Sequence, residues 1–171
     1  MNKSVCDNLA ETRKNLLKEI NLLSAAQFNR KPDLNQWSIA QVCHHLVLVE
    51  ESSIKAIAWG LRETNSTQKE RKDIQLLLLD RTKKIKAPII VEPNVEPFNI
   101  QEIVDLLNDS REKLLAFLST IDDTSILAEK SVKHPALGDL PLDQWIEQIY
   151  VHEQRHIEQI KEIKSLLDAR Q

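Results

Sequence analysis

The residues of this sequence best suited to chemistry are His152 and His156, which stand four positions apart in a helical pattern. On a helix, side chains at this spacing lie one turn apart on the same face. Apolar residues with the same period put both imidazoles near the middle of an apolar face; they are Trp145, Ile149, Ile160, Ile163 and Leu167. Such a pair has two interpretations. The rings are either core histidines hydrogen-bonded to neighbouring helices or metal ligands, because both ring nitrogens can reach one ion.

Residues 152–156 also spell His-Glu-x-x-His, the motif in which zinc proteases hold a metal and a water-activating glutamate. That motif requires a third ligand, which usually lies downstream. Residues 157–171 contain no histidine. Any third ligand must therefore come from upstream, and we do not favour a protease.

Composition narrows the class of protein that could carry this site. The chain has 171 residues, of which 42% are hydrophobic and 29% charged. This length and composition suit a single globular domain over residues 1–171. The formal net charge of −3 gives no basic surface, so we do not expect nucleic-acid binding. Two cysteines do not form a disulfide framework, and neither a signal sequence nor a membrane span is evident. We expect a cytoplasmic protein.

The elements that must position the histidines follow from apolar periodicity, which predicts four long amphipathic helices. They cover residues 4–24, 38 to at least 61, 99–121 and 141–169. Ser38-x-x-Gln41 and Asn99-x-x-Glu102 are capping-box patterns at the start of the second and third helices. Only two glycines occur in the chain, which favours long helices over sheets and turns.

The connections between these helices are unequal. A shorter helix is predicted over residues 68–84, after which Pro88, Pro93 and Pro97 exclude regular helix. Residues 122–140 form a second connection. We therefore expect an all-α fold, a four-helix bundle with a long crossover between the second and third bundle helices.

The second helix adds further candidates to the site. His45 lies on the flank of its apolar face, and Cys43 lies closer to the centre of that face. Cys43 is either a nucleophile or ligand, or a small buried hydrophobe, which we favour. Glu50 also projects to the apolar side, as an interior hydrogen-bonding partner or as a side chain reaching past the core edge. Trp59 lies off the inner face and marks a candidate contact surface.

Three separated segments resemble one protein family, the DinB-like (YfiT-like) family of metal-dependent proteins. They are Trp37-Ser38-x-x-Gln41-Val42-x-x-His45-Leu46, His134-Pro135-x-x-Gly138-x-Leu140 and His152-x-x-x-His156-x-x-Gln159-Ile160. The first segment departs from the family pattern at Gln41, where the family has glutamate. The order, spacing and helix assignment of the segments all agree with the family, and together they span nearly the whole chain.

This resemblance implies a bundle of up-down-down-up topology, often homodimeric, with a three-histidine metal site. Carried over, the ligands are His45, His152 and His156. Relatives of this family include transferases that use the thiols bacillithiol or mycothiol, maleylpyruvate isomerase among them. Imidazole ligands suit zinc or nickel, with iron or manganese as alternatives.

The function expected from this reading is a metal-dependent enzyme that activates a thiol or water towards a small-molecule substrate, of S-transferase or hydrolase type. The alternatives are a non-catalytic metal-binding stress-response protein and an all-helical interaction module. Glu153 and Glu50 are candidate bases or orienting groups. Because Glu153 points away from the bisector of His152 and His156, a structural role or a role in orienting a ligand suits it better than catalysis. We also expect a homodimer that uses the surface around Trp59.

Overall fold

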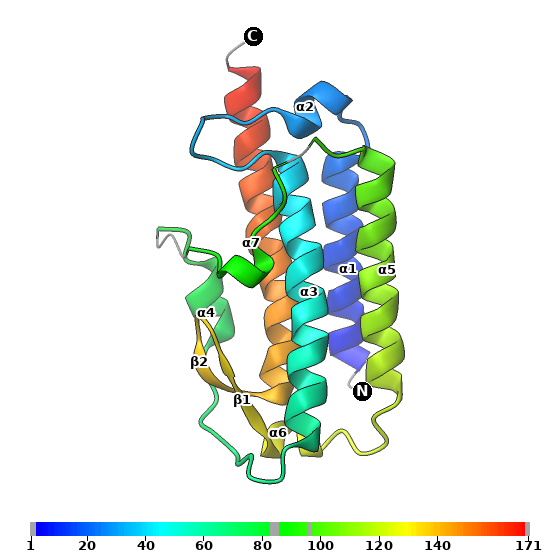
Figure 1. Cartoon of the computed structure of the whole chain (residues 1–171), viewed down its shortest axis with the longest axis vertical. Helices are drawn as coiled ribbons and strands as arrows, with labels where there is room; N and C mark the ends of the chain where they lie inside the picture. Colours follow the sequence, from blue (N-terminus) through cyan, green and yellow to red (C-terminus); the bar gives the residue numbers. More distant parts are fainter. Residues whose placement is uncertain (1–2, 83–85, 96, 170–171) are drawn as a thin grey trace.

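A computed structural model describes residues 3–82, 86–95 and 97–169, and within these residues four long helices form the bundle (Figure 1). They are α1 (Lys3–Ile20), α3 (Ile39–Arg62), α5 (Ile100–Ser119) and α7 (Leu142–Asp168). In Figure 1, α1 and α7 run upward and α3 and α5 run downward. The expected four-helix bundle with up-down-down-up topology is confirmed.

The ends of the helices follow from local capping chemistry. The Ser38 hydroxyl accepts the N–H of Gln41, and the Gln41 side chain accepts the N–H of Ser38, which completes the expected capping box of α3. Asn99 caps α5 by accepting the N–H groups of Gln101 and Glu102. The first helix ends at Ile20, earlier than predicted, because Ser24 caps a separate short helix, α2 (Ala25–Asn29).

The long crossover between α3 and α5 follows from their orientation. Since both helices run in the same direction, the chain must return along the whole bundle between Arg62 and Ile100. This connection contains α4 (Ile74–Leu79), which packs on α7, and a single 3-10 turn, η1 (Ile89–Val91). The prediction of a helix over 68–84 is wrong in its extent, because Asp73 caps α4 and Asp80 ends it. Residues 83 and 84 of that prediction lie outside the described residues.

The connection before α7 contains structure that the sequence interpretation missed. It holds α6 (Ile126–Glu129) and an antiparallel hairpin of β1 (Ser131–His134) and β2 (Gly138–Pro141). His134 pairs with Gly138 across the hairpin, and its Nδ1 accepts the N–H groups of Ala136 and Leu137 inside the turn. Gly138 has a φ of 73°, a conformation that favours glycine.

The core consists of two apolar clusters stacked along the bundle axis. One contains Leu9, Ile57, Leu114 and Ile149, and the other contains Leu16, Leu46, Leu107 and Ile157. In every long helix, therefore, the two clusters occupy successive stretches of the same apolar stripe. No helix within the described residues combines the length and apolarity that a membrane crossing requires.

Candidate metal centre

The two long helices α3 and α7 bring together the histidines that the sequence singled out. His45 projects from α3, and His152 and His156 project from successive turns of α7. One ring nitrogen of each can be chosen so that all three atoms lie within 4.8 Å of one another. The ring centroid of His45 lies 5.2 Å from that of His152 and 5.1 Å from that of His156. The three side chains thus converge on one point between the two helices.

The hydrogen bonds of the rings leave Nε2 available on two of the histidines. Nδ1 of His45 donates to the carbonyl of Val91 at 2.7 Å, and Nδ1 of His156 donates to Oε1 of Gln159 at 2.7 Å. Because both partners are acceptors, each Nδ1 carries the proton and each Nε2 carries a lone pair. Nδ1 of His152 is buried without a hydrogen-bond partner, and its Nε2 faces Nε2 of His156.

The surroundings keep the imidazoles neutral, which is the form that binds metals. Burial lowers the pKa of His156 to about 3, and the neighbouring His45 acts in the same direction. Burial also holds the pKa of His152 well below its usual value, with His156 and His45 adding to the effect. Burial likewise lowers the pKa of His45, although its hydrogen bond to Val91 opposes this. All three rings therefore present lone pairs at neutral pH.

The donor set fits a divalent ion such as zinc. Nε2 of His156 lies 3.1 Å from Nε2 of His152. Two nitrogens that bind one ion at about 2.0–2.1 Å in tetrahedral geometry lie roughly 3.3 Å apart, close to this separation. His45 and His156 are buried, whereas His152 is partly exposed, so solvent reaches one side of the cluster. A four-coordinate ion held by three imidazoles would keep one coordination position free.

The crossover is tied to the first turns of α3 around His45. The Gln41 side-chain amide donates to the carbonyl of Asn94 at 3.1 Å, and the N–H of Asn94 donates to Nδ1 of His44 at 3.1 Å. Together with the bond from His45 to Val91, these contacts hold the crossover against the ligand-bearing helix. Gln41 departs from the glutamate of the family pattern, and its amide supplies a donor that a carboxylate lacks.

Comparison with known proteins identifies the family of the chain. The sequence model of the DinB superfamily matches residues 8–160. The chain belongs to the DinB superfamily. It is 30% identical over 158 residues to YuaE of Bacillus subtilis strain 168, described as uncharacterized, and the match covers 92% of this chain and 96% of YuaE.

Two solved structures show the same fold as this DinB-superfamily chain. YfiT from Bacillus subtilis, described as a probable metal-dependent hydrolase with an unusual four-helix bundle topology, matches with a TM-score of 0.65. The identity is 17%, and the match covers 98% of this chain and 90% of YfiT. The four-helix bundle protein TT2238 matches with a TM-score of 0.61 and 19% identity, over 92% of this chain and 96% of that chain.

The two candidate glutamates of the site face a different part of the bundle. Glu50 and Glu153 are each 1% exposed and point into the bundle interior, where each binds two arginines. Burial acts to raise the pKa of Glu153, but Arg13 and Arg111 outweigh it and hold that pKa below its usual range. A carboxylate held by two guanidinium groups is a weak base. This supports the structural role expected for Glu153 and extends it to Glu50.

Arg13 and Arg111 are the residues of this region that the sequence interpretation missed. Arg13 lies between Leu9 and Leu16 on the apolar stripe of α1, and Arg111 lies between Leu107 and Leu114 on that of α5. A charged residue at such a position requires a buried partner of opposite sign. Two arginines and two glutamates at stripe positions, one in each long helix, are the signal that predicts their contact.

Cys43 is a buried core residue, as favoured from the sequence. It is fully enclosed in the cluster that also contains Leu46. Burial raises the pKa of its thiol to about 12, and the opposing effect of Arg13 is smaller. A thiol that stays protonated at neutral pH is neither an effective nucleophile nor a ready metal ligand.

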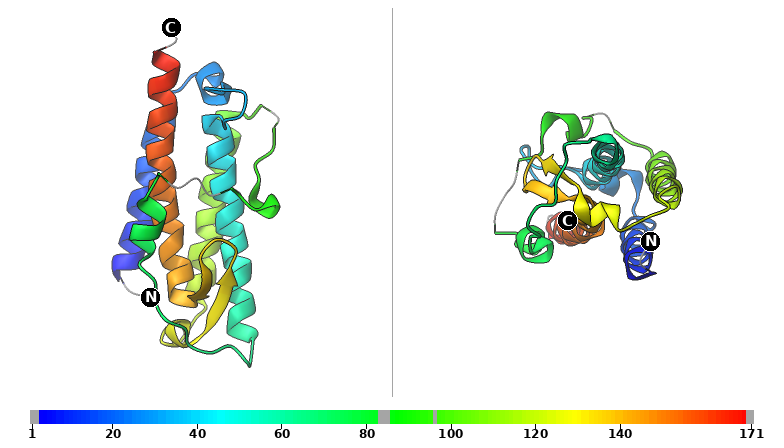
Figure 2. Two further views of the ribbon diagram at one scale, coloured as in Figure 1. Left: turned by 90° about the vertical axis from the view of Figure 1, so that its left-hand side faces the viewer. Right: turned by 90° about the horizontal axis from the view of Figure 1, so that it is seen from below.

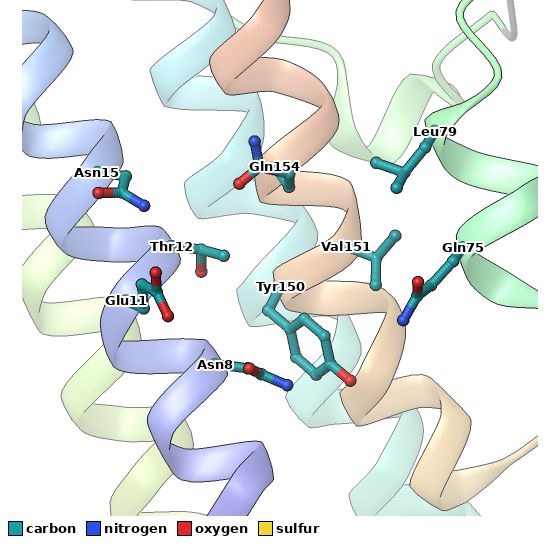
Figure 3. A pocket seen from close by; sticks show the side chains of 9 residues that line it. All are labelled: Asn8, Glu11, Thr12, Asn15, Gln75, Leu79, Tyr150, Val151 and Gln154. Atoms are coloured by element: carbon teal, nitrogen blue, oxygen red, sulfur yellow. The ribbon is translucent and has the colours of Figure 1, made fainter.

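A pocket of about 290 Å³ lies apart from the histidines, between α1, α4 and α7 (Figure 3). Tyr150 and Gln154 line it from α7, on the side of the helix opposite to His152 and His156. Thr12 lines it from α1 and also donates to Glu153 at 2.5 Å. None of the three clustered histidines contributes to its lining. Through Thr12 the pocket lies next to the buried Glu153, but it does not lead to the candidate metal centre.

Proposed function

We propose that this chain is a metal-dependent enzyme whose centre is held by His45, His152 and His156. The observation that carries the proposal is the convergence of three neutral imidazoles, from two helices, within 4.8 Å. A divalent ion bound there would supply Lewis acidity and lower the pKa of a bound water or thiol towards neutrality. The reaction class is hydrolysis, or transfer to a low-molecular-weight thiol, of a small-molecule substrate.

The residues around the centre suit this role. His45 and His156 each donate Nδ1–H to a fixed oxygen, which orients the ring and increases the basicity of Nε2. His152 is the partly exposed member of the cluster, and we expect a substrate to approach from its side. The description of YfiT as a probable metal-dependent hydrolase supports the same class of chemistry for a chain of this fold.

The two candidate glutamates, Glu50 and Glu153, are both held by Arg13 and Arg111, so neither is assigned as the base. Proton removal would instead depend on the ion and on the basicity of the nucleophile itself. This assignment separates the proposed enzyme from a His-Glu-x-x-His protease, where the glutamate is the base. Zinc and nickel are the proposed metals, with iron and manganese as further candidates.

Turnover with defined metals tests the proposal. Metal-free protein is reconstituted with zinc or nickel and screened with activated esters, and with bacillithiol or mycothiol plus electrophilic acceptors. We expect turnover that requires the added metal and falls at least about 100-fold in His45→Ala. Stoichiometric metal binding without turnover in either screen would instead support the non-catalytic metal-binding alternative.

A further inference from the structure

We propose that Arg13, Glu50, Arg111 and Glu153, called here the buried tetrad, position the metal centre by fixing α3 against α7. This inference rests on the proposed function, because the histidines it positions are the proposed metal ligands. The tetrad takes one side chain from each long helix of the bundle. Each of its members is at most 8% exposed at the side chain.

The two glutamates of the tetrad lie on the two helices that carry the histidines. Glu50 follows His45 on α3, about 7–8 Å further along the helix axis at 1.5 Å per residue. Glu153 is bonded directly to His152 on α7. A sliding or rotation of α7 that moves His152 away from His45 must therefore also move Glu153 relative to Glu50.

Both arginines bridge the two glutamates, so α3 and α7 are tied twice. Arg13 binds Glu50 at 2.8 Å and Glu153 at 2.8 Å. Arg111 binds the same carboxylates, at 2.5 Å for Glu50 and 3.1 Å for Glu153. In the view along the bundle in Figure 2, α3 lies beside α7 while α1 and α5 occupy the other side. The cations thus reach across the bundle from the two helices without histidines.

The remaining polar atoms of the tetrad also have partners. Thr12 donates to Glu153 at 2.5 Å, and Ser110 donates to Glu50 at 2.6 Å. Each arginine also donates to a carbonyl on the helix that carries the other arginine. Arg13 of α1 donates to Leu107 of α5, and Arg111 of α5 donates to Leu9 of α1. A register shift of one turn would break several of these contacts at once and leave buried charges without partners.

The physical gain from such a network is structural specificity. Replacing a buried ion network by well-packed apolar residues is often neutral or stabilising, so stability alone does not account for four charges in the middle of the core. The apolar clusters on either side are non-directional and would tolerate small helix shifts. A metal centre needs its ligands held to within about 0.5 Å, and the directional bonds of the tetrad supply that constraint.

The test removes both ties while keeping the buried charge balanced. The double variant Arg13→Met with Glu50→Met deletes one cation and one anion and leaves the Arg111–Glu153 pair. This removes every ion pair of the tetrad that involves α3. Cobalt(II) is the probe, with its affinity measured by titration and its coordination by the visible absorption spectrum. We expect a folded variant with affinity lowered by at least about tenfold and an altered spectrum.

Two further variants separate positioning from general loss of stability. Leu118→Ala creates a cavity about two turns of α5 beyond Arg111, and it should lower the melting temperature while leaving cobalt affinity and spectrum unchanged. Arg13→Lys keeps every charge but replaces the guanidinium fork by one ammonium, and it should weaken cobalt binding in a folded protein. It serves as the test should the double variant fail to fold.

The outcomes also distinguish this inference from the proposed function. Wild-type protein that binds no cobalt would contradict the metal centre itself. If the wild type binds cobalt and the double variant matches it in affinity and spectrum, the positioning role is wrong but the metal centre is not contradicted. If the double variant is unfolded, the same comparison is made with Arg13→Lys. Weakened binding in Leu118→Ala equal to that in the tetrad variants would likewise overturn the positioning role, because global destabilisation would then account for the loss.

Discussion

Glu153 binds Arg13 through a 2.8 Å ion pair inside the bundle, although its neighbour in the chain, His152, faces the histidine cluster. The two side chains diverge because successive residues of a helix are rotated by about 100°. Because Arg13 and Arg111 both hold the Glu153 carboxylate, the His-Glu-x-x-His pattern is present in sequence without the free glutamate that a metalloprotease uses as its base. In this chain the glutamate contributes to the interior of the bundle, and the histidines contribute to its candidate metal centre.

His134 should make stability depend on pH through the hairpin that precedes α7. Burial and the nearby Lys72 ammonium lower the pKa of His134 to about 4, and its Nδ1 accepts two backbone N–H groups, which requires the neutral ring. The unfolded chain takes up this proton first, near pH 6.5. The contribution of neutral His134 is therefore present above about pH 6.5 and is lost as pH falls towards 4, by roughly 1–3 kcal/mol in total.

The variant His134→Asn isolates this contribution, because the amide oxygen can accept the same N–H groups and does not titrate. Urea unfolding of both proteins at pH 7 and pH 4.5, in the same metal-free buffer, gives the difference. We expect the wild type to lose more stability than the variant between these pH values. Equal losses would show that His134 is not the group responsible.

Gly60 should be required for the close approach of α3 to the hairpin and to the start of α7. A Cβ atom at this position would lie 2.5 Å from Cγ2 of Val132 and 2.8 Å from Cδ2 of Leu142. Gly60→Ala should therefore destabilise the protein by about 1–3 kcal/mol, more than the helix propensity of alanine recovers. In a double-mutant cycle with Val132→Ala, the combined loss should be smaller than the sum of the single losses, since the clash is relieved. Strict additivity of the two would contradict this packing.

We further predict a homodimer that uses the outer side of α3. Trp59 is 50% exposed there, and an exposed tryptophan suits an interface better than free solvent. Light scattering at tens of micromolar gives the stoichiometry, and Trp59→Lys should shift a dimer towards monomer. A monomeric wild type would contradict the predicted dimer. A Trp59→Lys variant that stays dimeric would contradict only the proposed interface.

The bundle helices and the pairing of His152 with His156 were predictable because their signals are local. Ser38 with Gln41, and Asn99, mark helix starts by short-range chemistry, and the spacing of His152 and His156 is a property of one helix. That His45 joins them followed from the family resemblance, since one helix alone does not define its neighbours.

The features that were missed depend on contacts between distant segments. The hairpin has strands of four residues, too short for alternation to stand out, and it is stabilised by contacts such as the bond from Trp145 Nε1 to the carbonyl of Val132. The partners of Glu50 and Glu153 come from α1 and α5, and no local pattern pairs them. The positions of Glu50 and Glu153 on apolar stripes do show that each must have a buried polar or charged partner.

The central claim is that His45, His152 and His156 bind one metal ion. Its most direct test is the metal content of protein purified without an affinity tag, compared with His156→Ala prepared in the same way, with circular dichroism as the control for folding. The account predicts about one divalent ion per wild-type chain and none in the variant, which stays helical because apolar burial stabilises the bundle. A wild type that neither contains nor takes up a stoichiometric divalent metal, or a variant that retains it, would contradict the account.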